Sequence, residues 1–176
     1  PALNIVSEKE IGTTEQLNVT PMSKIIFILG KLIPFWIIGF FVLSAGIIVA
    51  ALIYDLLPAG SLTVIYTYSA VYILFVSGLG IVISNYSDTM QQAMFVMFFW
   101  VLIIILLSGL FTPISSMPRW AQIITYFNPL QYFMDVMRSI YLKGSGFSEL
   151  LPQFYALCGF AVAFNIWAVV SYRKSK

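Results

Sequence analysis

Four long apolar runs, nearly free of charged residues, dominate this chain and restrict what it can fold into. They predict membrane-spanning helices at residues 23–54, 62–85, 90–111 and 150–172. Each run is long enough, because about 20 helical residues cross the hydrocarbon core of a bilayer. The runs are continuous and do not alternate apolar with polar residues, which favours helices over barrel strands. The sequence therefore predicts an all-α integral membrane protein with four transmembrane helices.

The composition agrees with a lipid environment and excludes several functions. Only 9% of the 176 residues are charged and 60% are hydrophobic, whereas a soluble domain carries about 25% charged residues. The net charge of +2 is small, and the basic residues do not interleave with aromatic ones, so we expect no nucleic-acid partner. With no histidine and a single cysteine, we expect no metal site and no catalytic residue in this chain.

The basic residues indicate an orientation in the membrane. Six of the nine flank the first and last spans, and lysine and arginine concentrate on the cytoplasmic side of membrane proteins. Four spans bring both ends of the chain to one side, so we expect both ends to be cytoplasmic and residues 114–148 to be external. The first residue is proline, and we expect the chain to be a fragment of a longer protein.

The predicted external segment, 114–148, is apolar but broken by proline and glycine. We expect two short amphipathic helices that lie in the membrane interface or re-enter the membrane, with a loop packed on the bundle as the alternative. The apolar face of the first helix would hold Trp120, Ile123, Ile124 and Phe127. The apolar face of the second would hold Leu130, Phe133, Met134, Met137 and Tyr141, opposite Gln131, Asp135 and Arg138. Asp135 and Arg138 are spaced to form an ion pair.

A short charged segment, residues 7–20, precedes the first span. Ser7 to Glu10 and Thr13 to Gln16 each fit a capping box, in which a hydroxyl residue is followed three positions later by Glu or Gln. Gly12 separates the two boxes. The segment predicts a helix end, a glycine hinge and a short helix of about two turns. From spacing alone, an ordinary solvated connection is the alternative.

The order of residues in this segment resembles the ABC-2 type exporter permeases, and within them the multidrug or drug-resistance branch. That family carries an acidic-x-acidic-x-Gly-Thr-x-Glu-x-Leu-x-x-(Ser/Thr)-Pro pattern followed by Gly-Lys. The matching positions here are Glu8, Glu10, Gly12, Thr13, Glu15, Leu17, Thr20, Pro21, Gly30 and Lys31. A second resemblance lies downstream, in Gly-x-x-x-Pro, Met-Pro-x-Trp, Asn-Pro-Leu-x-Tyr and Arg-x-x-Tyr-Leu-x-Gly. Together the two matches extend from Glu8 to Gly146.

The resemblance implies that residues 1–176 are a fragment of an ABC-2 type permease domain. Family members have six membrane helices per subunit, of which this chain would hold the last four. Two permease subunits, identical or different, would work with two ABC ATPase subunits in the bacterial inner membrane and export an amphiphilic or hydrophobic cargo. Segment 7–20 would be the cytoplasmic coupling helix. Its ATPase-binding residues would be Glu8, Glu10, Gly12, Thr13, Glu15, Gln16 and Leu17.

The chain lacks a phosphate-binding motif of its own. Gly30-Lys31 has neither the upstream glycine nor the following hydroxyl of Gly-x-x-x-x-Gly-Lys-(Ser/Thr). We therefore expect no enzyme activity and no cofactor in this chain, with ATP and Mg²⁺ on the partner subunit. A small multi-span channel or passive pore is the alternative function, although no selectivity-filter sequence or arginine-rich sensor helix supports it. A membrane-embedded enzyme would need acids, bases or metal ligands that the spans do not offer.

A few residues inside the spans have two interpretations. Asn85, Asp88 and Asn165 could serve hydration or gating, or could simply make hydrogen bonds between helices and at the interface. An aromatic stripe could line a translocation path, or could face lipid or another helix. The stripe consists of Phe95, Phe98, Phe99 and Trp100.

Overall fold

The computed structural model describes residues 2–10 and 24–171, except for the side chains of residues 8–9 and 24–29. Every regular element in this part of the chain is helical. In chain order the elements are α1 (Ala2–Glu10), α3 (Lys24–Tyr54), α4 (Leu62–Tyr86), α5 (Met90–Leu106), η1 (Ile114–Ser116), α6 (Arg119–Thr125), α7 (Pro129–Lys143), η2 (Phe147–Leu150) and α8 (Leu151–Ser171).

Three helical stretches within the described residues are long and apolar enough to cross a membrane. They are Gly30–Tyr54, Leu62–Tyr86 and Phe147–Ser171. Helix α5 is also apolar but has 17 residues, so at 1.5 Å per residue it is about 25 Å long. This is less than the hydrocarbon core of a bilayer, about 30 Å. An all-helical membrane protein is therefore confirmed, with three long apolar helices and a shorter fourth.

Helix α5 ends at Leu106 rather than at the predicted residue 111, because the backbone turns sharply at Gly109. Gly109 has a φ of 78°, a left-handed conformation that glycine adopts without steric cost. The turn is supported by Ser108, whose hydroxyl donates to the Ile105 carbonyl oxygen at 2.7 Å. Hydropathy continues through this turn up to Phe111, which is why the apolar run overestimated the length of the helix.

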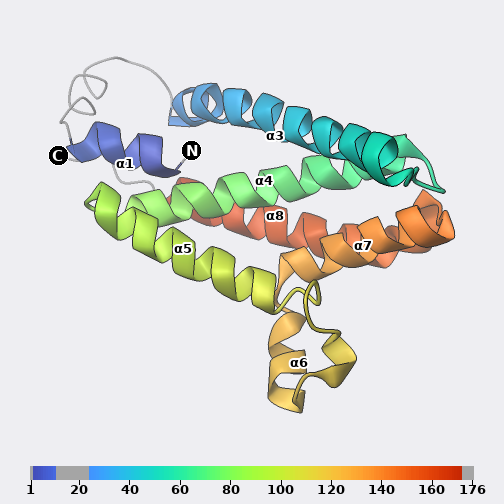
Figure 1. Cartoon of the computed structure of the whole chain (residues 1–176). Helices are drawn as coiled ribbons and strands as arrows, with labels where there is room; N and C mark the ends of the chain where they lie inside the picture. Colours follow the sequence, from blue (N-terminus) through green and yellow to red (C-terminus); the bar gives the residue numbers. More distant parts are fainter. Residues whose placement is uncertain (1, 11–23, 172–176) are drawn as a thin grey trace.

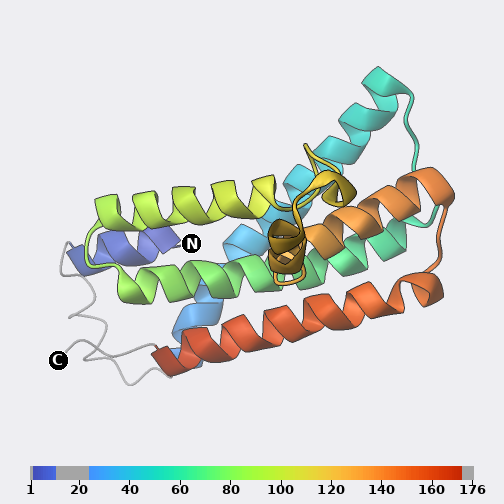
Figure 2. The same cartoon turned by 90° about the horizontal axis from the view of Figure 1, so that it is seen from below.

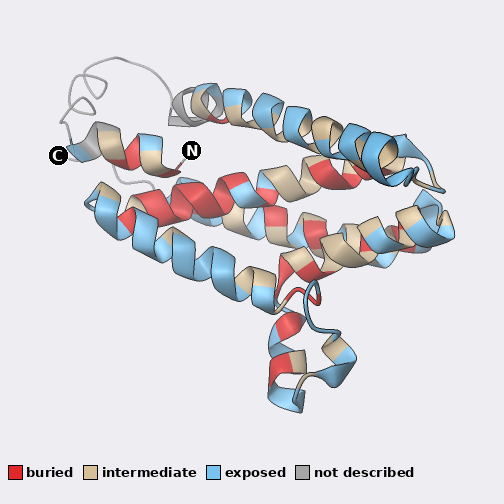
Figure 3. Cartoon of the chain, viewed as in Figure 1, coloured by how far each residue is buried: buried red, intermediate tan, exposed pale blue. Residues whose placement is uncertain are grey.

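Helix α4 is the centre of the bundle. Helices α1, α3, α5, α7 and α8 all pack against it (Figures 1 and 2), and buried residues concentrate along it (Figure 3). Helix α8 approaches it closely at Gly78, where a Cβ atom would lie 3.0 Å from the backbone nitrogen of Asn165. The missing side chain at Gly78 therefore allows the two backbones to approach, as small residues do between membrane helices.

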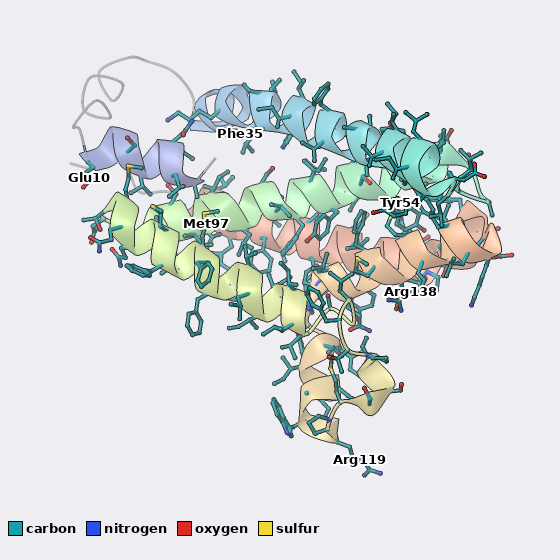
Figure 4. The ribbon with its side chains drawn as sticks, viewed as in Figure 1. Glu10, Phe35, Tyr54, Met97, Arg119 and Arg138 are labelled. Atoms are coloured by element: carbon teal, nitrogen blue, oxygen red, sulfur yellow. The ribbon has the colours of Figure 1, made fainter. Side chains whose placement is uncertain are left out.

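The bundle has two ends, which we name after Glu10 and Gly144. The Glu10 end holds the end of α4, the start of α5 and the end of α8, and the Gly144 end holds the start of α4 and the end of α7 (Figure 1). Helix α5 runs from the Glu10 end to about the middle of the bundle, and α7 continues from there to the Gly144 end. Between them, α6 projects away from the bundle, with Arg119 near its tip (Figure 4).

Helix α7 is helical, as predicted for this part of the segment. It packs on the bundle, which was the alternative placement, there expected of a loop. Its Val136 and Ile140 are buried in a cluster with residues of α4 and α8. On the predicted apolar face, Phe133 stacks on Tyr72 with ring centroids 4.6 Å apart. Met137 and Tyr141 pack against the same cluster.

The opposite face of α7 differs from its prediction. Gln131, which the sequence places on the polar face, is only 9% exposed. Asp135 and Arg138 were expected to pair, but the Arg138 guanidinium instead donates to the carbonyl oxygen of Gly109, at 3.3 Å. The turn after α5 therefore occupies this face, and it supplies a partner that the spacing within one helix could not reveal. The segment before α7 differs. The four residues predicted to form the apolar face of its helix are all exposed: Trp120, Ile123, Ile124 and Phe127.

Candidate functional site

The predicted coupling segment is the candidate site, and the structure describes only its first four residues, Ser7–Glu10. These are the last residues of α1, so Ser7 lies inside a helix and the capping box predicted for Ser7 to Glu10 is wrong. Helix α1 is stabilised here by tertiary packing, since Ile5 and Val6 are buried. Five of the predicted ATPase-binding residues lie outside the described residues: Gly12, Thr13, Glu15, Gln16 and Leu17.

Helix α1 is anchored where three longer helices meet. Its Ile5 shares a buried cluster with Leu32 of α3, Ile81 and Val82 of α4, and Ala168 of α8. The element that leads into the coupling segment is therefore held against the bundle at its Glu10 end.

Glu10 joins α1 to the first residue of α5. Its carboxylate Oε2 accepts a hydrogen bond from the backbone N–H of Met90, at 3.1 Å. The first N–H groups of a helix have no partner within the helix, and a negative charge there also interacts favourably with the helix dipole, by about 0.5 kcal/mol for an exposed side chain. Thr89 caps the same helix, because its hydroxyl accepts from the backbone N–H of Gln92 at 3.2 Å.

Helix α3, which follows the predicted coupling segment, is joined to α4 by two side-chain hydrogen bonds. The indole Nε1 of Trp36 donates to the hydroxyl of Ser77 at 2.8 Å, and the hydroxyls of Ser44 and Tyr66 are 2.6 Å apart. Residues 11–23 thus connect two helices that both pack on α4. A displacement of this segment would act on both helices.

The asparagines of the spans serve to join helices. Asn85 Nδ2 donates to the Ala168 carbonyl oxygen at 3.0 Å and to the Ser171 hydroxyl at 2.8 Å, which fastens the end of α4 to α8. Asn165 Nδ2 donates to the Leu74 carbonyl oxygen at 2.9 Å. The interpretation of both residues as interhelical hydrogen-bonding groups is confirmed.

Asp88 differs from the two asparagines. It is exposed, and its backbone N–H donates to the Gln92 side chain at 3.1 Å. It lies between α4 and α5 rather than inside a span, so it belongs to the connection at the Glu10 end.

The Asn-Pro-Leu sequence of the downstream motif joins α5 to α7. The Asn128 side chain accepts from the Leu130 backbone N–H at 3.0 Å and so caps α7. Its Nδ2 donates to the carbonyl oxygen of Ile104, in the last turn of α5, at 2.7 Å. One buried side chain thus satisfies a free donor of one helix and a free acceptor of another. The sequence signalled the cap by placing Asn before Pro129, but not the bond to α5.

Comparison with known proteins decides the family. Residues 2–170 match the family described as ABC-2 family transporter protein. The chain belongs to the ABC-2 family. It is 35% identical over 142 residues to the probable multidrug ABC transporter permease YbhR of Escherichia coli K12, which covers 81% of this chain and 39% of that protein. It is 31% identical over 148 residues to YbhS, another probable multidrug ABC transporter permease of that strain, covering 82% of this chain and 38% of YbhS.

A more distant relative matches almost the whole of this ABC-2 chain. The inner membrane transport permease YhhJ of Escherichia coli K12 is 27% identical over 175 residues, covering 97% of this chain and 46% of YhhJ. The chain therefore spans less than half the length of the curated relatives it matches. No solved structure matches the chain.

Proposed function

We propose that this chain is part of the transmembrane subunit of an ATP-binding-cassette exporter, which forms a translocation path and couples to a separate ATPase subunit. The observation that carries the proposal is the family match over residues 2–170. The names of YbhR and YbhS, as multidrug ABC transporter permeases, support a drug-like or amphiphilic cargo. The long apolar helices support a membrane location, and the name of YhhJ supports the bacterial inner membrane.

In this proposal, segment 7–20 transmits force from the ATPase subunit, which binds ATP and Mg²⁺. Closure of the ATPase subunits moves the segment, and the bundle responds as packed helices shift. The force reaches the bundle by three routes that the structure supports: α1 through Ile5, α3 through Trp36, and α5 through the bond between Glu10 and Met90. The Glu10 end then faces the cytoplasm.

A second permease subunit, identical or different, completes the path in this proposal. The aromatic stripe on α5 supports such a contact, because Phe95, Phe98 and Phe99 are each about two-thirds exposed within one chain. An exposed aromatic surface of this kind suits either another protein or lipid. The cargo would move between the two subunits.

The first test is a double substitution in the coupling segment, Glu15→Ala with Leu17→Ala, in the full-length permease purified with its ATPase subunit. We expect assembly to weaken and cargo-stimulated ATP hydrolysis to fall, because a polar contact and an apolar anchor are removed together. The matched control is Glu149→Ala with Leu142→Ala, which removes the same side-chain types at the Gly144 end. Normal assembly and normal stimulation in the coupling variant would rule out this role.

The same preparation distinguishes an exporter from a passive pore. Reconstituted vesicles should accumulate or release cargo only when ATP is present on the ATPase side. Equal cargo movement without ATP, or in the absence of the ATPase subunit, would support the pore and contradict the exporter.

A further inference from the structure

Two apolar cavities lie between α5 and α8 and are also lined by α4. The larger has a volume of about 400 Å³ and is lined by Phe75, Trp100, Ile103, Ile104, Leu107 and residues around the α6–α7 turn and α8. The smaller, of about 270 Å³, lies nearer the Glu10 end and is lined mainly by Leu79, Val82, Ile83, Tyr86, Val96 and Trp167. Helices α5 and α8 lie on either side of α4 at this point (Figure 2).

The two cavities are neighbours along α4 and share Trp100 and Phe164 in their walls. We call the pair the α5–α8 trough. Along α4 it extends from Phe75 to Ser87, which at 1.5 Å per residue is about 18 Å. The hydrocarbon core of a bilayer is about 30 Å thick, so one leaflet is about 15 Å deep. The trough therefore has the length of one leaflet and runs parallel to the helices.

The walls of the trough offer no free polar group for recognition at its deep end. The Asn128 amide is engaged by the Ile104 carbonyl oxygen and the Leu130 N–H. At the Glu10 end, the Ser87 hydroxyl donates to the Ile83 carbonyl oxygen at 2.8 Å. The remaining lining is aliphatic or aromatic. A ligand with polar groups along its length would leave them unsatisfied here, so the trough suits a hydrocarbon.

The Glu10 end of the trough has the amphipathic residues found where a membrane meets water. The indole Nε1 of Trp167 donates to the hydroxyl of Tyr86 at 3.3 Å, and their rings meet edge to face. Tryptophan and tyrosine concentrate at the head-group level of membranes, because they combine an apolar ring with a polar atom. A molecule with its polar end here and its tail toward Phe75 would match both ends of the trough.

A single alkyl chain is narrow enough to enter the trough, and its apolar surface matches the aliphatic and aromatic walls. We propose that the α5–α8 trough binds one acyl chain of a membrane phospholipid, with the head group beside Tyr86 and Trp167. This inference does not depend on the proposed export function.

The test fills the trough from its α5 wall and measures bound lipid. Val96→Trp and Ile103→Trp, combined, place large rings in the smaller and the larger cavity. The matched control is Val101→Trp, since Val101 is also an exposed aliphatic residue of α5 and lines neither cavity. Each full-length protein is purified from membranes in mild detergent. Native mass spectrometry then gives the lipid bound per chain, and lipid extraction identifies it.

We expect one retained phospholipid per chain in the unchanged protein and in Val101→Trp. In the trough-filling variant we expect retention to fall about tenfold, which corresponds to about 1.4 kcal/mol. Photo-crosslinking from a phospholipid with a diazirine in its tail should label peptides of α4 and α8 that line the trough, and this labelling should disappear in the filled variant. It provides a second measurement if filling the trough lowers the yield of folded protein.

Three results would overturn the proposal. Equal phospholipid retention in the filled and control variants would place the lipid elsewhere. Extraction of a non-lipid amphiphile in place of phospholipid would assign the trough to cargo. Crosslinking of the trough walls to α5 of a second copy, with no labelling by the lipid probe, would assign it to a protein contact.

Discussion

The carboxylate of Glu10 accepts a hydrogen bond from the backbone N–H of Met90, 80 positions away in the sequence, at 3.1 Å. The bond connects Glu10, the last described residue of the predicted coupling segment before the undescribed residues 11–23, to the first residue of α5. Because the acceptor is charged and the donor is the free end of a helix, the contact combines a hydrogen bond with a dipole interaction. It gives the coupling segment a direct link to a helix that is not its neighbour in sequence.

Removing either partner of this bond should weaken coupling. Glu10→Ala removes the acceptor, and Met90→Pro removes the donor while keeping a residue that is favoured at the first position of a helix. Both should lower cargo-stimulated ATP hydrolysis about two- to fivefold, equivalent to about 0.5–1 kcal/mol, with Glu10→Gln in between. Met90→Ala keeps the N–H and is the control. Loss of activity in Glu10→Ala alone, with Met90→Pro unaffected, would show that Glu10 acts through another contact.

Asn128→Ala should destabilise the bundle by about 1–3 kcal/mol, because it leaves the Ile104 carbonyl and the Leu130 N–H without their partner. Asn128→Ser keeps a neutral capping acceptor but is too short to donate to Ile104, so it separates the two roles and should cost less. Thermal unfolding in detergent measures both. Asn4→Ala, at an exposed position of α1, is the control, and an equally small effect at both positions would contradict the role of Asn128.

Gly78→Ala should force α4 and α8 apart, because the added Cβ would lie 3.0 Å from backbone atoms of Phe164 and Asn165. Backbone cannot move aside as a flexible side chain can, so we expect a loss of about 1–3 kcal/mol. Gly46→Ala is a matched control, since nothing lies within 4 Å of its Cβ position, and alanine there should stabilise the helix by up to about 1 kcal/mol. Opposite signs in the unfolding temperature would support the packing; equal effects would not.

The long helices could be predicted from the sequence, because a sustained apolar run has few alternatives to a membrane helix. The predicted helix ends at residues 54 and 85 agree with the structure within one residue. Asp55, Pro58 and Gly60 follow the first helix, and the polar residues 87–89 follow the second. The end of α5 could not be predicted from hydropathy, because Gly109 changes the backbone direction without changing the polarity of the run.

The spacing of residues within a short segment predicted side-chain pairs and helix ends less well where groups from elsewhere in the fold offer other contacts. The spacing of Asp135 and Arg138 indicated an ion pair, but the Gly109 carbonyl oxygen lies within reach of Arg138 and takes its place. The spacing of Ser7 and Glu10 indicated a helix start, but α1 already runs through these residues because its apolar side chains are buried by three other helices. In both cases the deciding group comes from a distant part of the chain.

The junction at Asn128 divides one side of the bundle into two helices. Helix α5 extends from the Glu10 end to the middle, and α7 extends from there to the Gly144 end. Helices α3, α4 and α8, in contrast, are each a single continuous helix. If segment 7–20 transmits force as proposed, a displacement of Met90 would reach α7 through this junction, where Asn128 bonds to the Ile104 carbonyl oxygen and Arg138 to the Gly109 carbonyl oxygen. The Glu10 half of this side would then tilt about the junction while the Gly144 half keeps its shape.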